Sequence, residues 1–470
     1  MIIILTSFEN LCRISCTLVK NMIIFMRKEV EKMEFETLKK SYLKRNIVIA
    51  VVVVAIISAI ILTFTRAKYK NTESIPLVNG TINYSLADLN IVAIKVDGRE
   101  VDTIPDGNYK LTSESYCTIN NKKDSSIKLS YDNNTKALSV TPMTKKGTKC
   151  YLDFKTSATK KVDTILGQIN VNLDTPDFNK TAQESCGSTS TCEETNGIYE
   201  SIDDYGTTYY YRGSVDNNWV KFAGFYWRII RINGDGSIRM IYQGTSANIT
   251  GTETQLQTNV FSSNSNRSEY VGYMYTTGQQ HGNSINSTIK GVLDSWYQTN
   301  ITNKGYGNKV STETGFCGDR NMTSGYSWSS QPSSTIYYAG YGRLAQNSSS
   351  VNPTFKCNNS NDLYTTSSSS KGNKALSNPI GLITADEVVM AGLSWSGSTT
   401  SNYLYTGQHY WTMSPYRFLL SNVQLFFVNS TGSLNGCYVS DTRGTRPVIN
   451  LSADVKVTGS GTNSDPFVVS

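Results

Sequence analysis

The sequence predicts an α+β protein with an N-terminal transmembrane helix, a small immunoglobulin-like β-sandwich and a larger domain with a mainly antiparallel sheet and two helices. Three observations predict this class. An uncharged apolar run lies near the N-terminus, short strand-like runs separated by turn residues follow it, and two helical patterns interrupt the strand-like runs of the C-terminal half.

The transmembrane helix is predicted at 47–65, a run of nineteen residues without a charge. A membrane-spanning helix needs about twenty apolar residues. Residues 1–46 carry nine Lys or Arg against five Asp or Glu, so the positive-inside bias places this tail in the cytoplasm. We expect a single-pass signal anchor in the cell membrane with an extracellular C-terminal part. Met26 and Met33 are alternative start positions.

A stalk is predicted at 66–80. After it, the runs LNIVAIKV, SIKLSYD, KALSVTPM and KCYLDFK alternate with turn residues such as Asp97-Gly98. Short strands at this spacing predict an immunoglobulin-like β domain at 81–180. The polar stretch 181–205 is predicted to be a linker, and 206–470 a second domain.

The second domain begins with a strand at 219–232 that is apolar on both faces and therefore central. A turn at 233–236 returns the chain in an antiparallel strand. Two helices are predicted. Apolar residues at helical spacing from Ile285 to Trp296 indicate the first, and the capping box Thr384-Ala-Asp-Glu387 begins the second. The Ser-, Asn-, Gly- and Tyr-rich segment 320–375 between them is predicted to be a long loop region.

Seven of the nine cysteines follow the apolar run. Outside the membrane, their order predicts three disulfides, Cys117–Cys150, Cys186–Cys192 and Cys317–Cys357. Cys437 is left over and is predicted to be a buried thiol. The alternative is metal binding, but structural zinc sites need closer Cys or His spacings than these, so no metal is expected.

Charge and histidine content argue against two functional classes. Of the net charge of +7, +4 lies in the first 46 residues. The remaining 35 basic and 32 acidic residues are spread over more than four hundred positions and form no dense basic face, so nucleic acid is not an expected partner. His281 and His409 are the only histidines, which limits acid–base catalysis. Asp386 and Glu387 are adjacent, and helix capping explains both. We expect no enzyme, no catalytic residue and no cofactor.

Five landmarks within 209–470 resemble, in the same order, an uncharacterised bacterial domain family found in secreted and surface proteins. They are Phe222-Ala-Gly-Phe-Tyr-Trp-Arg-Ile-Ile230, Leu293-Asp-Ser-Trp-Tyr297, Ile380-Gly-Leu-Ile-Thr-Ala-Asp-Glu-Val388, Tyr410-Trp-Thr-Met-Ser-Pro415 and Gly444-Thr-Arg-Pro-Val448. That family is similar to the C-type-lectin-like fold of formylglycine-generating enzymes and phage receptor-binding proteins. The resemblance implies a C-type-lectin-like domain at 206–470 whose loops display a ligand site.

Two departures from the resemblance matter. Formylglycine-generating activity needs paired cysteines, and Cys437 has no near partner in the sequence, so that activity is not implied. The family has Trp-Trp-Leu-Arg where this chain has Met413 at the Arg position, so any role of that Arg is lost or has moved to Arg417.

The loops expected at 320–375 and 394–422 are rich in Tyr, Trp, Ser and Asn, which is typical of recognition loops. We therefore expect a membrane-anchored, extracellular binding or adhesion-type protein of a low-GC bacterium, with an extracellular glycan, cell-wall or protein ligand. The alternatives are a non-binding structural envelope protein and a cell-surface hydrolase. The candidate ligand-binding residues are Trp328, Trp395, Tyr403, Tyr405, Tyr416 and Arg417, with Tyr337 and Tyr338 as further candidates.

Overall fold

The computed structural model describes residues 73–76 and 89–470, except 106, 108, 133–136, 143–146, 157–158, 187–188, 248–249, 332–333 and 348. The predicted tail, the predicted helix at 47–65 and most of the predicted stalk lie outside these residues. Within the described ranges, no helix is long and apolar enough to cross a bilayer.

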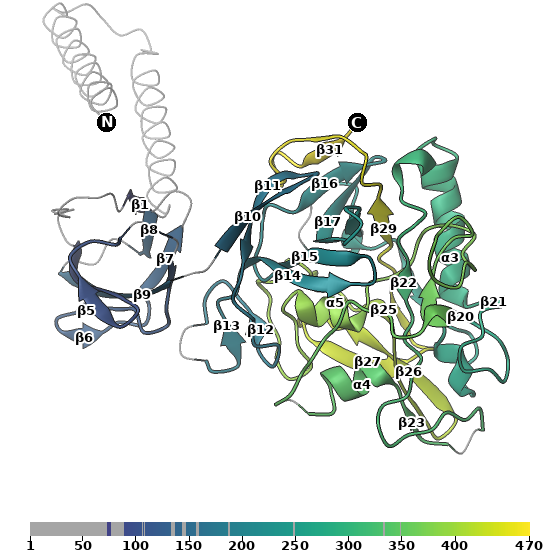
Figure 1. The fold of residues 1–470 in the computed structure, drawn as a ribbon. Helices are drawn as coiled ribbons and strands as arrows, with labels where there is room; N and C mark the ends of the chain where they lie inside the picture. The colour runs from purple at the N-terminus through teal and green to yellow at the C-terminus, as the bar shows by residue number, and fades with distance from the viewer. Residues whose placement is uncertain are drawn as a thin grey trace, which may run out of the picture. The chain divides into compact units, whose positions relative to one another are not determined.

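The described chain is mainly β-structure, so the predicted fold class, α+β behind a transmembrane helix, is wrong (Figure 1). Its α-helices are short: α3 (Thr288–Tyr297), α4 (Ala339–Leu344) and α5 (Ala385–Met390). Helices of ten, six and six residues are too short to build a helical layer. Most of the apolar residues are instead buried between strands.

Residues 89–156 form a small body of two sheets with a common core. Ile94 and Phe154 from one sheet are buried together with Leu138 and Val140 from the other. The larger sheet has the order β3-β2-β9-β5-β6, with β4 also paired to β9, and the smaller has the order β1-β8-β7. The strands are β1 (Glu73–Pro76), β2 (Leu89–Val96), β3 (Arg99–Val101), β4 (Tyr109–Leu111), β5 (Tyr116–Ile119), β6 (Lys122–Lys123), β7 (Lys128–Asp132), β8 (Ala137–Thr141) and β9 (Thr148–Thr156).

The immunoglobulin-like topology predicted for this body is corrected by two observations. Strand β2 pairs in parallel with β9, whereas immunoglobulin sheets are antiparallel. Cys117 and Cys150 are directly opposed on the neighbouring strands β5 and β9, so their disulfide lies within one sheet and does not bridge the two. The bridge does join two strands of this domain, as the sequence predicted.

The larger body begins at about residue 159, earlier than the predicted boundary. Strands β10 (Thr159–Thr164) and β11 (Gly167–Asn172) form a hairpin, and β11 pairs in parallel with β14 (Gly197–Asp203). Val171 and Ile198 are opposed and buried in this pairing. The predicted linker at 181–205 is therefore structured, because it contains β12 (Thr181–Ala182), β13 (Cys192–Glu193) and β14.

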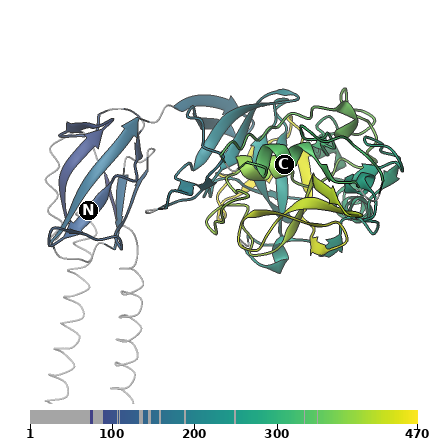
Figure 2. The same ribbon diagram turned by 90° about the horizontal axis from the view of Figure 1, so that it is seen from below.

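A ten-stranded sheet forms the centre of the larger body. Strand β17 (Phe225–Ile232) lies between β18 (Ile238–Gly244) on one side and β15 (Gly206–Arg212) and β16 (Trp219–Phe222) on the other. The single strand predicted at 219–232 is wrong, because Ala223 and Gly224 turn the chain and β16 pairs antiparallel with β17. The predicted central position of 225–232 and its antiparallel return in β18 are confirmed. The C-terminal strands β29 (Val448–Leu451), β30 (Val457–Thr458) and β31 (Phe467–Val469) complete the sheet. Figure 1 shows β29 and β31, in yellow, near the teal strands β16 and β17, and Figure 2 shows the same ribbon turned by 90°.

A second, six-stranded sheet carries the C-terminal hairpins. Its order is β19-β28-β25-β26-β27, and β23 pairs with the free edge of β25. The strands are β19 (Thr258–Val260), β23 (Ile336–Tyr337), β25 (Tyr410–Leu419), β26 (Asn422–Val428), β27 (Leu434–Tyr438) and β28 (Thr442–Gly444). Two further two-stranded pairs are β20 (Met274–Tyr275) with β21 (Ile285–Asn286), and β22 (Phe316–Cys317) with β24 (Leu363–Tyr364).

Both predicted helices exist, with small changes in their bounds. Helix α3 begins after Ser287, whose side chain accepts from the N–H of Lys290, so Ile285 falls outside the helix and in β21. Helix α5 has the complete Thr384/Glu387 capping box. Helix α4 lies in the predicted loop region and was not expected. Single 3-10 turns lie at Thr252–Thr254, Ser268–Val271, Gly307–Lys309 and Ser360–Asp362, and a π turn at Gln298–Thr302 extends α3.

All three predicted disulfides are present, and Cys437 is a free, buried cysteine. Burial raises the pKa of the Cys437 thiol to about 12, despite the nearby Arg443. Since the thiolate is the reactive form, this thiol should be unreactive in the folded protein.

We expect iodoacetamide at pH 8 to leave the native protein unlabelled at Cys437, and to label it after unfolding in urea. Mass spectrometry without reduction should show three cross-linked cysteine pairs in both samples. Rapid labelling of Cys437 in the native protein, at the rate of a small free thiol, would contradict its burial.

Candidate binding face

Strand β25 carries a β-bulge that places Tyr416 beside Arg417. Pro415 opposes Leu425 and Arg417 opposes Gln424, so Tyr416 is the extra residue. An extra residue bends a strand and redirects its side chains. The Arg417 guanidinium lies 5.1 Å from the centroid of the Tyr416 ring, and its Nε donates to Oε1 of Gln424 at 2.6 Å. The bulge thus holds an aromatic ring and a cation together.

A row of directly opposed residues crosses this sheet. Tyr337 on β23 opposes Arg417, Arg417 opposes Gln424, and Gln424 opposes Tyr438 on β27. Residues directly opposite one another share a face of the sheet. Tyr438 is 45% exposed and Tyr337 is half-buried, so both ends of the row reach solvent.

Tyr326, Tyr337, Tyr341, Trp395 and Tyr416 form a continuous cluster of rings, here called the aromatic face. The ring centroids of Tyr326 and Tyr337 are 4.9 Å apart, and those of Tyr337 and Tyr341 are 4.2 Å apart. Tyr416 lies 5.7 Å from Tyr341 and 5.2 Å from Trp395. Tyr326 is 36% exposed and Tyr416 is buried. The other three rings of the cluster, Tyr337, Tyr341 and Trp395, are half-buried. The cluster therefore rises from the core to the surface.

Phe426 anchors the aromatic face to the core of the sheet. Its ring is fully buried, 5.0 Å from Tyr416 and 5.8 Å from Trp395. Gly340 of α4 permits the close approach of the helix, since a Cβ there would lie 3.3 Å from the Phe426 ring. Helix α4 therefore packs over the sheet and supplies Tyr341 to the aromatic face.

The structure brings three of the six predicted ligand-binding residues together: Trp395, Tyr416 and Arg417. Tyr416 and Arg417 lie on a strand and not in the predicted loop, because β25 continues to Leu419 and pairs with β26. Trp328 and Tyr405 are half-buried and share no ring contact with the aromatic face in the described residues.

Tyr403 and Tyr338 are core residues, so both are removed as candidates. The Tyr403 ring is 5% exposed and lies 5.4 Å from the Arg228 guanidinium. Burial raises the pKa of Tyr403, although Arg228 opposes this shift. Tyr338 is fully buried and donates its hydroxyl hydrogen to the carbonyl of Ser268 at 2.7 Å. Neither side chain can reach a ligand at the surface.

Sequence reasoning missed Tyr326 and Tyr341. The spacing of Tyr337 and Tyr341 gives no helical signal, because Tyr337 lies on β23 and α4 begins only at Ala339. No sequence signal marks Tyr326. It joins the cluster only because its ring packs against Tyr337 after a loop has brought the two together.

A buried network of charges lies between the two sheets and contains both acidic residues of α5. Arg231 pairs with Asp203 and with Glu387, at 3.3 Å to the latter, and Arg239 also pairs with Glu387. Arg343 donates to both oxygens of Asp386 at 2.9 Å and to Asp319 at 2.6 Å. The cavity among these groups measures about 30 Å³, room for about one or two water molecules.

This network holds its carboxylates in structural ion pairs. Burial by itself raises the pKa of Glu387, but Arg239, Arg231 and the N–H of Thr384 outweigh burial and hold that pKa below its usual value. Asp386 is held by both contacts from Arg343 and also accepts from the N–H of Thr354 at 3.0 Å. The cavity has no space for a sugar or peptide beside these carboxylates. Capping therefore accounts for Glu387 as predicted, whereas Asp386 is held by Arg343 and not by a role in the cap.

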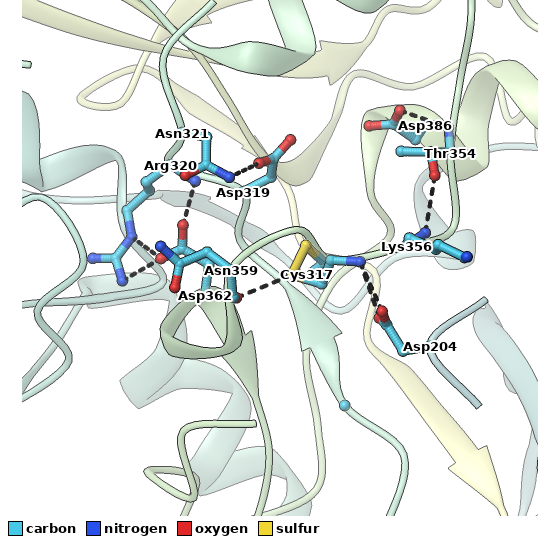
Figure 3. The surroundings of a disulfide bond; sticks show 12 residues. Asp204, Cys317, Asp319, Arg320, Asn321, Thr354, Lys356, Asn359, Asp362 and Asp386 are labelled. Atoms are coloured by element: carbon cyan, nitrogen blue, oxygen red, sulfur yellow. Dashed lines mark hydrogen bonds and ion pairs between the residues drawn. A yellow bond between two sulfur atoms is a disulfide. The ribbon is translucent and has the colours of Figure 1, made fainter. Parts of the chain in front are cut away.

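The Cys317–Cys357 disulfide lies next to this network (Figure 3). The N–H of Cys357 donates to both oxygens of Asp204, at 3.1 and 3.0 Å. The disulfide closes the segment 317–357, which carries Tyr326, Tyr337 and Tyr341. It therefore restrains three of the five rings of the aromatic face against the core.

Both histidines have structural contacts. His281 Nδ1 lies 2.9 Å from Asp362, whose carboxylate also accepts from the Nε and the N–H of Arg320. Figure 3 shows this Arg320–Asp362 pair close to the disulfide. His409 is exposed, and its Nδ1 accepts from the N–H of Ser430 at 3.2 Å. The described residues include no group of three or more His, Cys, Asp or Glu arranged to hold a metal.

No family model matches the chain, and no curated protein or solved structure does so either. The five landmarks of the family resemblance lie on β16–β17, the end of α3, the start of α5, β25 and the approach to β29. All are core elements of the larger body. The resemblance to that family stays a prediction.

Proposed function

We propose that the chain is an extracellular binding protein of adhesion type, from a low-GC bacterium, that holds its ligand on the aromatic face. One observation carries the proposal: Arg417 and five contacting rings form a cluster that rises from buried Tyr416 to exposed Tyr326. Tyr, Trp and Arg are the residues most often found as interface hot spots. Rings already packed against one another lose little conformational entropy when a ligand binds.

The three disulfides support an extracellular location, because such bonds persist in oxidising compartments. The Cys317–Cys357 bond in particular restrains the segment that supplies Tyr326, Tyr337 and Tyr341. A glycan, a cell-wall polymer or a protein are the ligand classes that such a mixed aromatic and cationic face accommodates. The sugar ring can stack on aromatic faces, and Arg417 can bind an acceptor oxygen.

The proposal is tested by replacing Tyr326 with Ala and Arg417 with Gln in the full chain. The probe is an immobilised cell-wall fraction from a low-GC bacterium, with bound protein measured against concentration. Each variant should bind about tenfold more weakly than the wild type, in the range of a moderate hot spot. Tyr326 makes one ring contact, so its loss should leave the melting temperature nearly unchanged.

Tyr306→Ala is the matched control. Tyr306 is 38% exposed against 36% for Tyr326, and it too makes one ring contact, to Phe222 at 5.5 Å. This variant should bind as the wild type does. If folded wild-type protein fails to bind the fraction, or if the three variants bind equally well, the aromatic face is not a ligand site and a structural role in the envelope is favoured.

A further inference from the structure

A hollow of about 410 Å³ lies on the large sheet and shares no residue with the aromatic face. The β10–β11 hairpin, the start of β14, the end of β15 and the β30–β31 turn surround it. We call it the amide cleft, because its polar wall consists mainly of five carboxamides: Gln168, Asn170, Asn172, Asn196 and Asn217. Its floor is apolar and buried, and is formed by Ile169, Ile198, Tyr211 and Phe467. The volume lies within the usual range of small-ligand sites.

Among the described residues, no Asp, Glu, Lys or Arg lines the amide cleft. This is unusual for a chain in which charged residues make up 17% of the sequence. An ionic ligand entering it would lose hydration and gain no opposite charge, which is costly. Carboxamides both donate and accept hydrogen bonds. The lining therefore favours a ligand that is neutral, polar and partly apolar.

Two of the carboxamides are available to such a ligand. The side chains of Asn172 and Asn217 make no hydrogen bond with any described residue, and Gln168 uses only its Nε2, which donates to Asp163 at 3.2 Å. Asn196 differs, because it donates to the carbonyl of Gln183 and accepts from the N–H of Ser214. Asn196 thus holds the wall in place, whereas Asn172 and Asn217 can turn to a ligand.

A glycine explains the position of Asn172. Gly197 has a φ of 133°, and a Cβ on it would lie 2.6 Å from Nδ2 of Asn172. Any other residue at this position would push the carboxamide away from the cleft wall. The backbone of β14 therefore leaves room for a polar side chain that no protein group binds.

We propose that the amide cleft binds an N-acetylated hexosamine unit of a neutral glycan. The acetamido group offers an N–H and a carbonyl, which a carboxamide can bind in both directions. Its methyl group can lie on the apolar floor of Ile169, Ile198 and Phe467, and the sugar hydroxyls can bind Gln168 and Ser460 at the rim. This site is independent of the aromatic face, and either can exist without the other.

Three trisaccharides with the same β-1,4-linked pyranose skeleton test the proposal, because they differ only in the group on C2. They are triacetylchitotriose, with an acetamido group, cellotriose, with a hydroxyl, and fully deacetylated chitosan trimer, with an ammonium. Calorimetric titration of the full chain should give saturable binding of triacetylchitotriose. Cellotriose should bind about tenfold more weakly, as expected for a lost hydrogen bond, and the cationic trimer should bind no better than cellotriose.

Asn172→Asp and Asn217→Asp each replace a hydrogen-bond-donating NH₂ group by a negatively charged oxygen, and the volume of the side chain hardly changes. Each should weaken triacetylchitotriose binding about tenfold or more. Asn435→Asp, the same change at an exposed position on β27, should bind as the wild type does. Asn217 is exposed in a loop, so its variant should fold even if Asn172→Asp does not. Equal affinity for the three trisaccharides, no saturable binding, or unchanged binding by Asn217→Asp would overturn the proposal.

Discussion

Replacing Glu387 by Gln should lower the free energy of unfolding by about 3–5 kcal/mol, because buried Arg239 then loses the carboxylate with which it pairs and buried Arg231 keeps only Asp203. Glu387 is 2% exposed and pairs with Arg231 and Arg239, which are themselves buried. The substitution also weakens the capping box, in which the carboxylate accepts from the N–H of Thr384 at 3.0 Å. Urea denaturation followed by tryptophan fluorescence measures the loss.

The unfolding free energy that Glu387→Gln loses should decrease as the pH falls. The pKa of Glu387 is lowered in the folded state, so its contribution is complete above the unfolded-state pKa, near 4.5, and is lost as pH falls through the folded-state value. The difference between wild type and Glu387→Gln should therefore be largest at neutral pH and shrink in acid. A difference that stays constant from pH 7 to pH 3 would contradict the ion-pair role.

Glu200→Gln is the control for Glu387→Gln. Glu200 pairs with Lys160, but both side chains are more than one-third exposed to water. Exposed pairs contribute little to stability, so this variant should unfold as the wild type does. Equal effects of the two substitutions would mean that the loss reflects net charge and not burial.

Replacing Trp227 by Ala should lower the free energy of unfolding by about 3–5 kcal/mol, the range for large-to-small changes in cores. The Trp227 side chain is 0% exposed. Its ring lies 5.7 Å from Tyr242 and 6.1 Å from Trp296, and its Nε1 donates to the carbonyl of Phe222 at 3.1 Å. The substitution removes these contacts and leaves a cavity between the central strand and α3.

Trp227→Phe separates volume from hydrogen bonding. Phenylalanine restores most of the apolar volume and loses only the bond to Phe222, so it should recover more than half of the stability lost in the alanine variant. Thermal melting of both variants measures the difference. If Trp227→Ala melts within a degree or two of the wild type, β17 is not the central core strand.

Local sequence patterns predicted the elements that depend on near neighbours. The hairpin of β17 and β18 was predictable because an apolar strand runs into Asn-Gly-Asp-Gly, where the Asp235 carboxylate accepts from the N–H of Ser237 at 3.0 Å. The preceding turn at Ala223 and Gly224, which separates β16 from β17, was missed. Helix α5 was predictable because Thr384 and Glu387 satisfy one another's backbone N–H groups. The cysteine order predicted the three disulfides because each bridge joins two cysteines that are consecutive in the sequence.

Distant contacts decided the candidate site. Arg417 was a candidate in the sequence, but only the bulge in β25 and the pairing of β23 with β25 place it between Tyr416 and Tyr337. Tyr403 and Tyr416 have the same side chain and neighbouring positions in the chain, yet Tyr403 is buried against Arg228 and Tyr416 joins the aromatic face. Composition cannot separate the two, because both rings are buried and they differ only in the side chains that pack against them.

The sequence by itself determined the local elements: the hairpin of β17 and β18, the capped helix α5, the amphipathic helix α3 and the cysteine pairs. Only the tertiary structure decided that the chain is mainly β, that residues 159–172 join the sheet of the larger body, and that Arg231 meets Glu387 across 156 residues. Arg446 illustrates the reason. It is fully buried with the carbonyls of Tyr242 and Leu404 as acceptors, partners 204 and 42 residues away, and no local pattern encodes pairings over such distances.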